Sequence, residues 1–259
     1  MANAARLTEQ RQDVVAGDKE IIGIYNALFD VTSAQTAEEK SAAYRLRYQV
    51  YVEETAFLEK TDNPGGLETD RFDARSGHSL LIHLMTREIA GVVRIIPPVP
   101  DMPGCDLPAR MAAPALDQLP EAMLPRATTG EISRFSIAKS YRRRRDDWLF
   151  PSLLNELGVR GDVGRVIPHI ALGLMTGVFD QVVRFNLTHL CAIIDPALLR
   201  LLRRLGIEFQ TIGNPVEFHG MRQPVMASCQ DLVEQLSVNR PEIYQLISRS
   251  HQLSLQDIR

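Results

Sequence analysis

Three charged side chains interrupt segments that otherwise have the apolar composition of buried strands. Arg94 falls in one such segment, and Glu131 and Arg134 fall in a second. An unpaired charge inside a sheet is costly, so these groups are expected to pair with one another or with Asp70 and Asp73. A buried charge network of this kind marks a functional site more often than it serves stability.

Each of these features also has a purely structural interpretation. The carboxylates of segment 67–73 could be solvated around a turn, and Arg94 could lie on an edge strand. Glu131 and Arg134 could pair without any further role. The arginine run 142–145 is typical of a solvated helix start. Only the joint occurrence of these features favours a site.

The elements that must position these side chains mix helical and extended patterns. Apolar residues spaced by three, four and seven indicate a helix after Thr36, which the breaker cluster 63–66 ends. A tight turn at 87–88 would join two strands into a hairpin, and a strand–helix–strand unit follows later. The chain is therefore expected to form an α/β (α+β) sheet with helices on both faces. The expected strands cover 78–86, 89–98, 129–142, 188–195 and 216–229, and the expected helices cover 37–54, 169–186, 196–205 and 231–250.

One domain is expected to hold all of these elements. Residues 1–35 are assigned to an N-terminal arm, in which the apolar segment 21–30 could dock as a strand or short helix. Residues 36–259 are assigned to a single domain. Its long insertion loop, 97–125, contains eight prolines and leaves room for short helical turns only.

Composition excludes several classes of protein. A net charge of −3 and a pI near 6.1 disfavour a nucleic-acid binder. The three cysteines are scattered and show no metal-ligand spacing, so we expect reduced thiols and no metal site. The N-terminus lacks the apolar core of a signal peptide, and no apolar run approaches the ~18 residues of a membrane span. A cytoplasmic protein is expected.

Four motifs follow one another along the chain: R-x-x-V-[FY] at 47–51, E-x-D-x-[FY]-D at 68–73, G-x-x-R at 91–94 and E-[IV]-S-R-[FL] at 131–135. In this order they resemble the autoinducer (acyl-homoserine-lactone) synthases of the GNAT superfamily. They are still more similar to the long-chain N-acyl amino acid synthases and to acyltransferases associated with PEP-CTERM/exosortase systems. The resemblance implies a GNAT-like fold, in which a mixed central sheet has splayed middle strands.

The resemblance also implies a role for each matching residue. Glu131, or Asp70 as the second candidate, would take a proton from an attacking amine, with Arg134 completing the catalytic group. Because Glu131 and Arg134 would point to opposite faces of a regular strand, a β-bulge between them is expected. Backbone N–H groups near 135–137 would face the thioester carbonyl. The implied substrate-binding residues are Arg47, Tyr51, Phe57 (where the family has tryptophan), Asp73, Arg94, Ser133, Phe135 and Ile137.

The donor class is predicted from a departure from the superfamily pattern. CoA-using GNAT enzymes carry a glycine-containing pyrophosphate loop after this strand, whereas this chain has YRRRRDDW at 141–148. The segment 131–165 has a net charge of +3 and the segment 53–73 a net charge of −5. The first would attract acidic acyl carrier protein through Arg142, Arg143, Arg144 and Arg145, and the second would suit an amine. Acyl-CoA stays the alternative donor, and no permanently bound cofactor is expected.

The function expected from this resemblance is an N-acyltransferase that moves a long-chain fatty acyl group from acyl carrier protein to an amino acid or similar amine. One alternative is an acyl-homoserine-lactone synthase that uses S-adenosylmethionine. A second is a non-catalytic GNAT-like protein that binds lipid or acyl carrier protein. The helices 169–186 and 196–205 have a core interpretation and an alternative one, in which Leu172, Met175, Val178 and Phe179 line a tunnel for the acyl chain.

Overall fold

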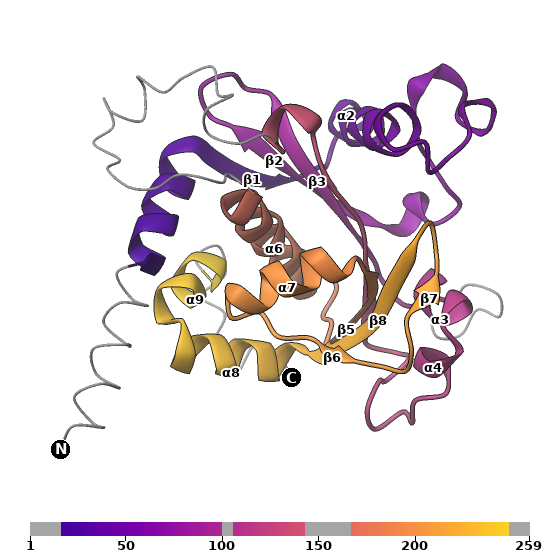
Figure 1. The fold of residues 1–259 in the computed structure, drawn as a ribbon, viewed down its shortest axis with the longest axis vertical. Helices are drawn as coiled ribbons and strands as arrows, with labels where there is room; N and C mark the ends of the chain where they lie inside the picture. Colours follow the sequence, from indigo (N-terminus) through magenta and orange to yellow (C-terminus); the bar gives the residue numbers. More distant parts are fainter. Residues whose placement is uncertain (1–16, 100–105, 143–166, 249–259) are drawn as a thin grey trace.

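A computed structural model describes residues 17–99, 106–142 and 167–248 of the chain. Within these residues, eight strands form a mixed sheet in the order β1–β2–β3–β4–β5–β8–β6, and β7 pairs with β8 (Figure 1). The strands are β1 Phe29–Ser33, β2 Gly77–His83, β3 Ile89–Ile96, β4 Thr129–Ile137, β5 His189–Ile194, β6 Gln210–Thr211, β7 Val216–Glu217 and β8 Met221–Ser228. The helices with labels are α2 Ala37–Tyr48, α3 Pro108–Ala112, α4 Pro114–Asp117, α6 Ile167–Arg184, α7 Pro196–Arg204, α8 Cys229–Asn239 and α9 Pro241–Ser248.

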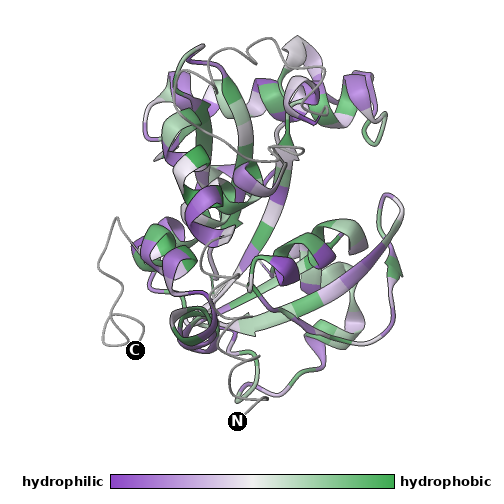
Figure 2. Cartoon of the chain, turned by 60° about the vertical axis from the view of Figure 1, so that its left-hand side comes forward, coloured by the Kyte–Doolittle hydropathy of each residue, from purple (hydrophilic) through white to green (hydrophobic). Residues whose placement is uncertain are grey.

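Helices α2 and α6 cover opposite faces of the antiparallel half of the sheet. Ser79 and Leu81 of β2 face α6, where they approach its glycines Gly177 and Gly173. His78 has the opposite parity on the strand and packs edge-to-face on Tyr44 of α2, with ring centroids 5.3 Å apart. Figure 2 shows the hydrophilic and hydrophobic residues along the sheet and the helices.

Local chemistry explains where α2 begins and how it ends. Thr36 accepts a hydrogen bond from the Glu39 backbone, and the Glu39 carboxylate accepts one from the Thr36 backbone, which completes a capping box. After Tyr48 the helix widens into a π-helical turn, Gln49–Glu54, closed by the Thr55 N–H on the Val50 carbonyl at 3.2 Å. Such turns occur mainly at functional sites, because they re-aim side chains.

The middle of the sheet opens between β4 and β5. Their parallel pairing covers three residue pairs and ends at Glu131, which lies opposite Cys191. Beyond this point no described strand pairs with that edge of β4. On the other edge, the β3–β4 register shifts between Val92 and Arg94, and Arg134 adopts a φ of +52°. The expected β-bulge and the expected splay are both present.

The element types expected from the sequence agree closely with the described structure. The hairpin turns at Arg87, which has a φ of +61°, and α7 starts at Pro196 and stops before Gly206, whose φ is +79°. The insertion loop contains only the short helices α3 and α4 within its described part. None of the described helices is long and apolar enough to cross a membrane.

The described part of the N-terminal segment docks on the sheet, as the apolar segment 21–30 was expected to do. Residues 17–28 form a helix, and β1 then pairs antiparallel with β2 at the edge of the sheet. Tyr25, Leu28 and Phe29 are fully buried in the main core. The described part of the segment 1–35 is therefore integrated into the sheet, because its apolar side chains complete the packing around α6.

Gly177 lets α6 pack closely on β2. A Cβ atom at this position would lie 2.6 Å from the Ser79 Cβ and 3.0 Å from a Val31 methyl group. We expect Gly177→Ala to lower the free energy of unfolding by ~1–3 kcal/mol, measured by urea denaturation. Gly23→Ala is the control, since the added Cβ meets nothing within 4 Å and alanine favours a helix. Equal stability of both variants would contradict this packing argument.

Candidate active site

A buried network of three arginines and three carboxylates lies beneath α2. Arg47 of α2 binds Glu68 at 2.5 Å and both carboxylate oxygens of Asp73 at 2.7 and 3.0 Å. Arg94 of β3 binds Asp70 and Asp73, each at 2.7 Å. Arg134 of β4 binds Glu68 at 2.9 Å and Asp70 at 3.2 Å. The formal charges within this network cancel.

The register of the sheet places the network on one face. His78, Arg94 and Ser133 are direct cross-strand neighbours on β2, β3 and β4. The Arg94 Nε donates to the Ser133 hydroxyl at 2.9 Å, which fixes the guanidinium along this row. Glu131 has the same parity as Ser133, and the bulge turns Arg134 toward the same face. Arg134 therefore reaches carboxylates that a regular strand would have directed it away from.

The network sets the protonation of its members. Burial alone would raise the pKa of Glu68, but hydrogen bonds and positive charge from Arg134 and Arg47 lower it to about 2. Burial also opposes ionisation of Asp73, yet Arg47 and Arg94 hold its pKa well below the usual range. His78 lies 3.7 Å from Asp73, but burial and the charge of Arg47 lower its pKa to about 4. At neutral pH His78 is therefore uncharged.

Glu131 is a further buried carboxyl group that does not belong to this network of ion pairs. It pairs with none of the arginines within hydrogen-bonding distance; instead, its Oε2 accepts from the Ala109 backbone N–H at 2.7 Å. Burial raises the pKa of Glu131 to about 7, opposed by this N–H and by the charges of Arg94 and Arg134. A carboxyl group that titrates near neutral pH can accept a proton from a substrate.

The insertion loop supplies the Ala109 donor. Arg110 is buried and donates to the carbonyls of Leu116 and Leu124 at 3.3 and 2.7 Å, which holds the loop from within. On its outer side Arg126 forms ion pairs with Asp106, Asp117 and Glu121. A loop braced in this way keeps the Ala109 N–H aimed at Glu131.

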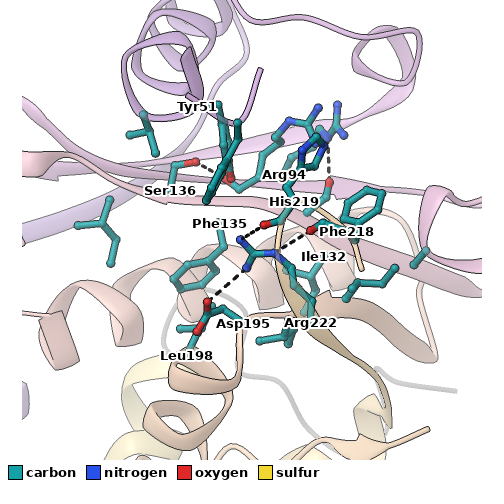
Figure 3. A pocket seen from close by; sticks show the side chains of 18 of the residues that line it. Tyr51, Arg94, Ile132, Phe135, Ser136, Asp195, Leu198, Phe218, His219 and Arg222 are labelled. Carbon is teal, nitrogen blue, oxygen red and sulfur yellow. Dashed lines mark hydrogen bonds and ion pairs between the residues drawn. The ribbon is translucent and has the colours of Figure 1, made fainter. Parts of the chain in front are cut away.

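A cavity of about 570 Å³ opens beside Glu131, within the range of ligand-binding pockets. It lies between the splayed half of β4 and helix α7, as Figure 3 shows. The side chain of Tyr51, from the π-helical turn, lies under the guanidinium of Arg134 at 5.5 Å from the ring centroid. The site residues expected from the sequence that line this cavity are Tyr51, Phe57, Asp70, Arg94, Glu131, Ser133, Arg134, Phe135, Ile137 and Arg142.

Two expected substrate-binding residues do not line the cavity. Arg47 is fully buried and Asp73 is 6% exposed. Asp73 accepts from Arg94, which lines the cavity, and Arg47 binds Asp73 and Glu68. Their geometry makes them supports of the cavity wall, and substrate contact requires the residues that line it.

The exposed edge of β4 provides hydrogen-bond donors to the cavity. From Ile132 to Ile137 this strand has no described partner on the β5 side, and alternate N–H groups of a strand point to the same edge. Phe135, Ser136 and Ile137 all line the cavity. Backbone N–H groups at this edge could stabilise an oxyanion in an apolar surrounding.

The opposite wall comes from the C-terminal half of the chain. Leu198, Leu201 and Leu202 of α7 line it, together with Ile193 and Ile194 of β5. Asp195 and Arg222 add a charged pair, with 3.6 Å between Oδ2 and Nη1. The turn between β7 and β8 carries Phe218 and His219, and His219 stacks on Phe57 with ring centroids 6.2 Å apart.

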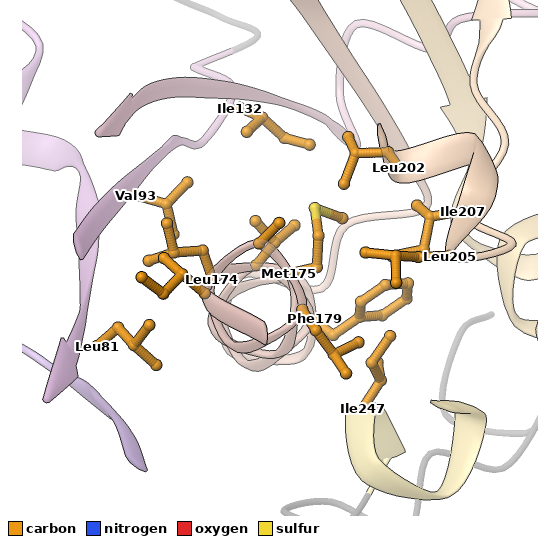
Figure 4. Packing of buried hydrophobic residues seen from close by; sticks show 14 of the residues in the cluster. Leu81, Val93, Ile132, Leu174, Met175, Phe179, Leu202, Leu205, Ile207 and Ile247 are labelled. Carbon is orange, nitrogen blue, oxygen red and sulfur yellow. The ribbon is translucent and has the colours of Figure 1, made fainter. Parts of the chain in front are cut away.

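The tunnel interpretation of α6 is wrong for three of its four residues. Leu172, Val178 and Phe179 are fully buried in the main core, and only Met175 reaches the cavity. Figure 4 shows Leu174, Met175 and Phe179 of α6 enclosed by residues of the sheet, α7 and α9. The tunnel fails because α6 lies at the centre of the packing, so the apolar wall of the cavity comes from α7 instead.

The arginine run is described only at its first residue. Arg142 is exposed, forms an ion pair with Glu54 and lines the cavity. Arg143, Arg144 and Arg145 lie outside the described residues. A donor-docking role for the run stays a prediction.

Sequence reasoning missed four contributors to the site. Glu68 stands in the recognised motif at 68–73, but site roles were predicted only for Asp70 and Asp73 of that motif. Ala109 contributes through its backbone N–H, which no side chain reveals. Asp195 and Arg222 were missed because neither of them belongs to a recognised motif. The Asp195–Pro196 sequence signals a helix N-cap, which is the one local signal that draws attention to this wall.

Part of the chain matches a family model, and several solved structures share its fold. Residues 46–150 match the family model of an acetyltransferase (GNAT) domain. The crystal structure of TofI in a ternary complex with an inhibitor and MTA has a TM-score of 0.54 at 16% identity, covering 82% of this chain and 99% of that chain. No curated protein matches the sequence.

Two further solved structures share the fold. The AHL synthase LasI has a TM-score of 0.52 at 15% identity, covering 76% of this chain and 88% of that chain. The CoA-dependent acyl-homoserine lactone synthase BjaI, solved with SAM and isopentyl-CoA, has a TM-score of 0.52 at 18% identity, covering 86% and 89%. The expected GNAT-like fold, a mixed central sheet flanked by helices, is confirmed.

Arg47 is expected to contribute most to the stability of the charge network. Arg47→Met leaves Glu68 and Asp73 short of a buried partner, so we expect a loss of ~3–5 kcal/mol in the free energy of unfolding, measured with urea. Arg45→Met, which removes an exposed neighbour on α2, should change stability by less than ~1 kcal/mol.

The stabilisation from Glu68 is present above its unfolded pKa of 4.5 and is lost as pH falls toward about 2. In Arg47→Met the free energy of unfolding should therefore depend less steeply on pH between 4.5 and about 2. Similar stabilities of Arg47→Met and Arg45→Met would contradict the importance of the network.

The Ala109 N–H is expected to favour the ionised form of Glu131. Ala109→Pro removes this one donor, and we expect the pKa of Glu131 to rise, followed by carbon-13 NMR of labelled glutamate carboxyls. Glu131→Gln assigns the signal, and Ala109→Gly, which keeps the N–H, is the matched control. An unchanged Glu131 titration in Ala109→Pro would show that the hydrogen bond has no electrostatic effect.

Proposed function

We propose that this protein is an N-acyltransferase that moves a fatty acyl group from a carrier-protein thioester to the amine of an amino acid or similar small molecule. The observation that carries the proposal is Glu131, a buried carboxyl group with a pKa near 7 beside the cavity. Nucleophilic attack requires a neutral amine, and Glu131 can remove its proton at physiological pH. The match of residues 46–150 to an acetyltransferase model supports the same class of reaction.

The reaction needs no covalent acyl-enzyme. The amine nitrogen attacks the thioester carbonyl carbon, and Glu131 takes the amine proton, directly or through a water molecule. Backbone N–H groups near Phe135 to Ile137 stabilise the oxyanion, which then collapses and expels the thiolate. Transfer of the proton to this leaving group returns Glu131 to its carboxylate form.

The cavity suits an acyl chain at one end and polar groups at the other. Its α7 and β5 wall is aliphatic, while Asp70, Arg94 and Arg134 hold the polar side. Asp70 already accepts from two arginines and from the Phe72 N–H at 2.8 Å, so it is a weaker choice of base than Glu131. We assign Asp70 to orienting the acceptor.

The preference for acyl carrier protein over CoA rests on the segment after β4. This segment has no glycine between Ile137 and the end of the arginine run, so it lacks the usual pyrophosphate-binding loop. Arg142 lies at the cavity and begins a basic run that an acidic carrier protein would attract.

Transfer assays separate this function from its alternatives. Acyl carrier proteins and CoA thioesters of several chain lengths are incubated with amino acids or with labelled S-adenosylmethionine, and the products are identified by mass spectrometry. N-acyl amino acids from acyl carrier protein support the proposal. Acyl-homoserine lactone as the main product would replace it with the autoinducer synthase, and donor binding without any product would favour a binding protein.

Glu131→Gln tests the assigned base directly. We expect a loss of turnover of ~10²–10⁴-fold, with donor affinity unchanged, because the amide keeps the shape of the side chain and cannot take the proton. In the wild-type protein kcat/KM should rise with pH through about 7, as Glu131 loses its proton. Unchanged turnover in the variant would remove Glu131 from this role.

A further inference from the structure

Arg222 differs from the other described arginines that line the cavity. Arg94 and Arg134 each have carboxylate oxygens within 3.2 Å, and Arg142 pairs closely with Glu54. The nearest described carboxylate to Arg222 is Asp195 at 3.6 Å, which is beyond hydrogen-bonding distance. Arg222 is therefore the lining guanidinium, among the described residues, that retains capacity for an anionic ligand.

Two backbone carbonyls and an aromatic ring hold Arg222 in place, and Asp195 is the one described carboxylate that pairs with it. Its Nε donates to the Phe218 carbonyl at 3.1 Å and its Nη2 to the His219 carbonyl at 3.4 Å. Its guanidinium lies over the ring of Phe57 at 5.7 Å. The positive φ angles of His219 and Gly220 fold the turn so that both carbonyls face this side chain. These contacts fix the guanidinium in one position before a ligand binds. The side chain of Arg222 is only 20% exposed.

Asp195 also caps helix α7. Its Oδ1 accepts from the Ala197 N–H at 2.7 Å and caps α7, so only the other oxygen faces Arg222. The negative charge that remains there favours a ligand with a single charge over a doubly charged phosphate. In Figure 3, Arg222 and Asp195 lie on the side of the cavity across from Tyr51 and Arg94.

We propose that Arg222 binds the α-carboxylate of the acceptor, so that the acceptor is an amino acid and not a simple amine. This inference rests on the proposed acyl transfer and specifies its substrate class. A guanidinium binds a carboxylate through two parallel hydrogen bonds, which orients as well as holds it. Glu131 lines the same cavity as Arg222, and the inference requires the amine of the same molecule to reach it. Phe57 and His219 flank the anchoring point.

The test compares each amino acid with the amine that results from removing its carboxyl group. The pairs are leucine with isoamylamine, phenylalanine with phenethylamine, and glycine with methylamine, each assayed with acyl carrier protein as donor. Arg222→Met keeps the length of the side chain and removes the charge. We expect it to raise KM for the amino acids by ~10–100-fold with little change in kcat, since a hydrogen-bonded charge pair stabilises binding to this extent. KM for the simple amines and for the donor should not change.

Controls separate this role from a structural one. Arg222→Lys should restore part of the affinity for the amino acids, and Arg200→Met, on the exposed side of α7, should behave as wild type. An equal loss for amino acids and simple amines would overturn the inference while leaving acyl transfer intact. So would a rise in the donor KM alone, which would assign Arg222 to a phosphate of the donor.

Calorimetry keeps the inference testable if no transfer is detected. Titration of wild-type protein with leucine, phenylalanine and glycine should show binding that Arg222→Met loses. That result would support the carboxylate site even if the proposed function failed. No binding of any amino acid to the wild-type protein would overturn the inference.

Discussion

The charge balance beneath α2 constrains the rest of the site. Three guanidinium groups and three carboxylates pair with one another, and Arg47, Arg94, Glu68 and Asp73 among them are almost fully buried, so removing one of these four leaves a costly charge behind. Burial raises the pKa of Glu131 to about 7, and the Ala109 N–H and the charges of Arg94 and Arg134 oppose this rise only in part. Glu68 is also buried, but its hydrogen bonds and ion pairs with Arg134 and Arg47 lower its pKa to about 2. The two glutamates therefore differ because the guanidinium groups hydrogen-bond Glu68, while Glu131 accepts from a backbone N–H.

A single extra residue in β4 serves both the network and the opening of the sheet. The bulge at Arg134 turns its side chain toward Glu68 and Asp70, and it shifts the register against β3. The other edge of the strand then diverges from β5 after Glu131. One local distortion thus accounts for the arginine on the network face and for the free backbone edge that lines the cavity.

The sequence predicts those parts of the site that lie within regular strands. Arg94 and Glu131 are conspicuous because their apolar neighbours predict burial, and the bulge follows from the odd spacing of Glu131 and Arg134. The Ala109 donor could not be found, since a backbone N–H leaves no trace in side-chain identity. The helices at 169–186 and 196–205 were interpreted first as core, with a tunnel along the former as the alternative. Two apolar helices do not reveal from their sequence which one occupies the centre of the packing. Arg222 was missed because its partners are carbonyls of a turn and no motif marks it.

The two walls of the cavity differ in how freely they can change. The side formed by β3, β4 and α2 is held by ion pairs that depend on one another, so a substitution there affects stability and chemistry together. The side formed by α7 and the β7–β8 turn uses aliphatic packing and hydrogen bonds to carbonyls, which tolerate exchange of single residues. In the proposed reaction, substitutions on this second wall would alter the preferred acyl chain or acceptor without contacting Glu131. The geometry would then separate the step that transfers a proton from the contacts that select the substrates.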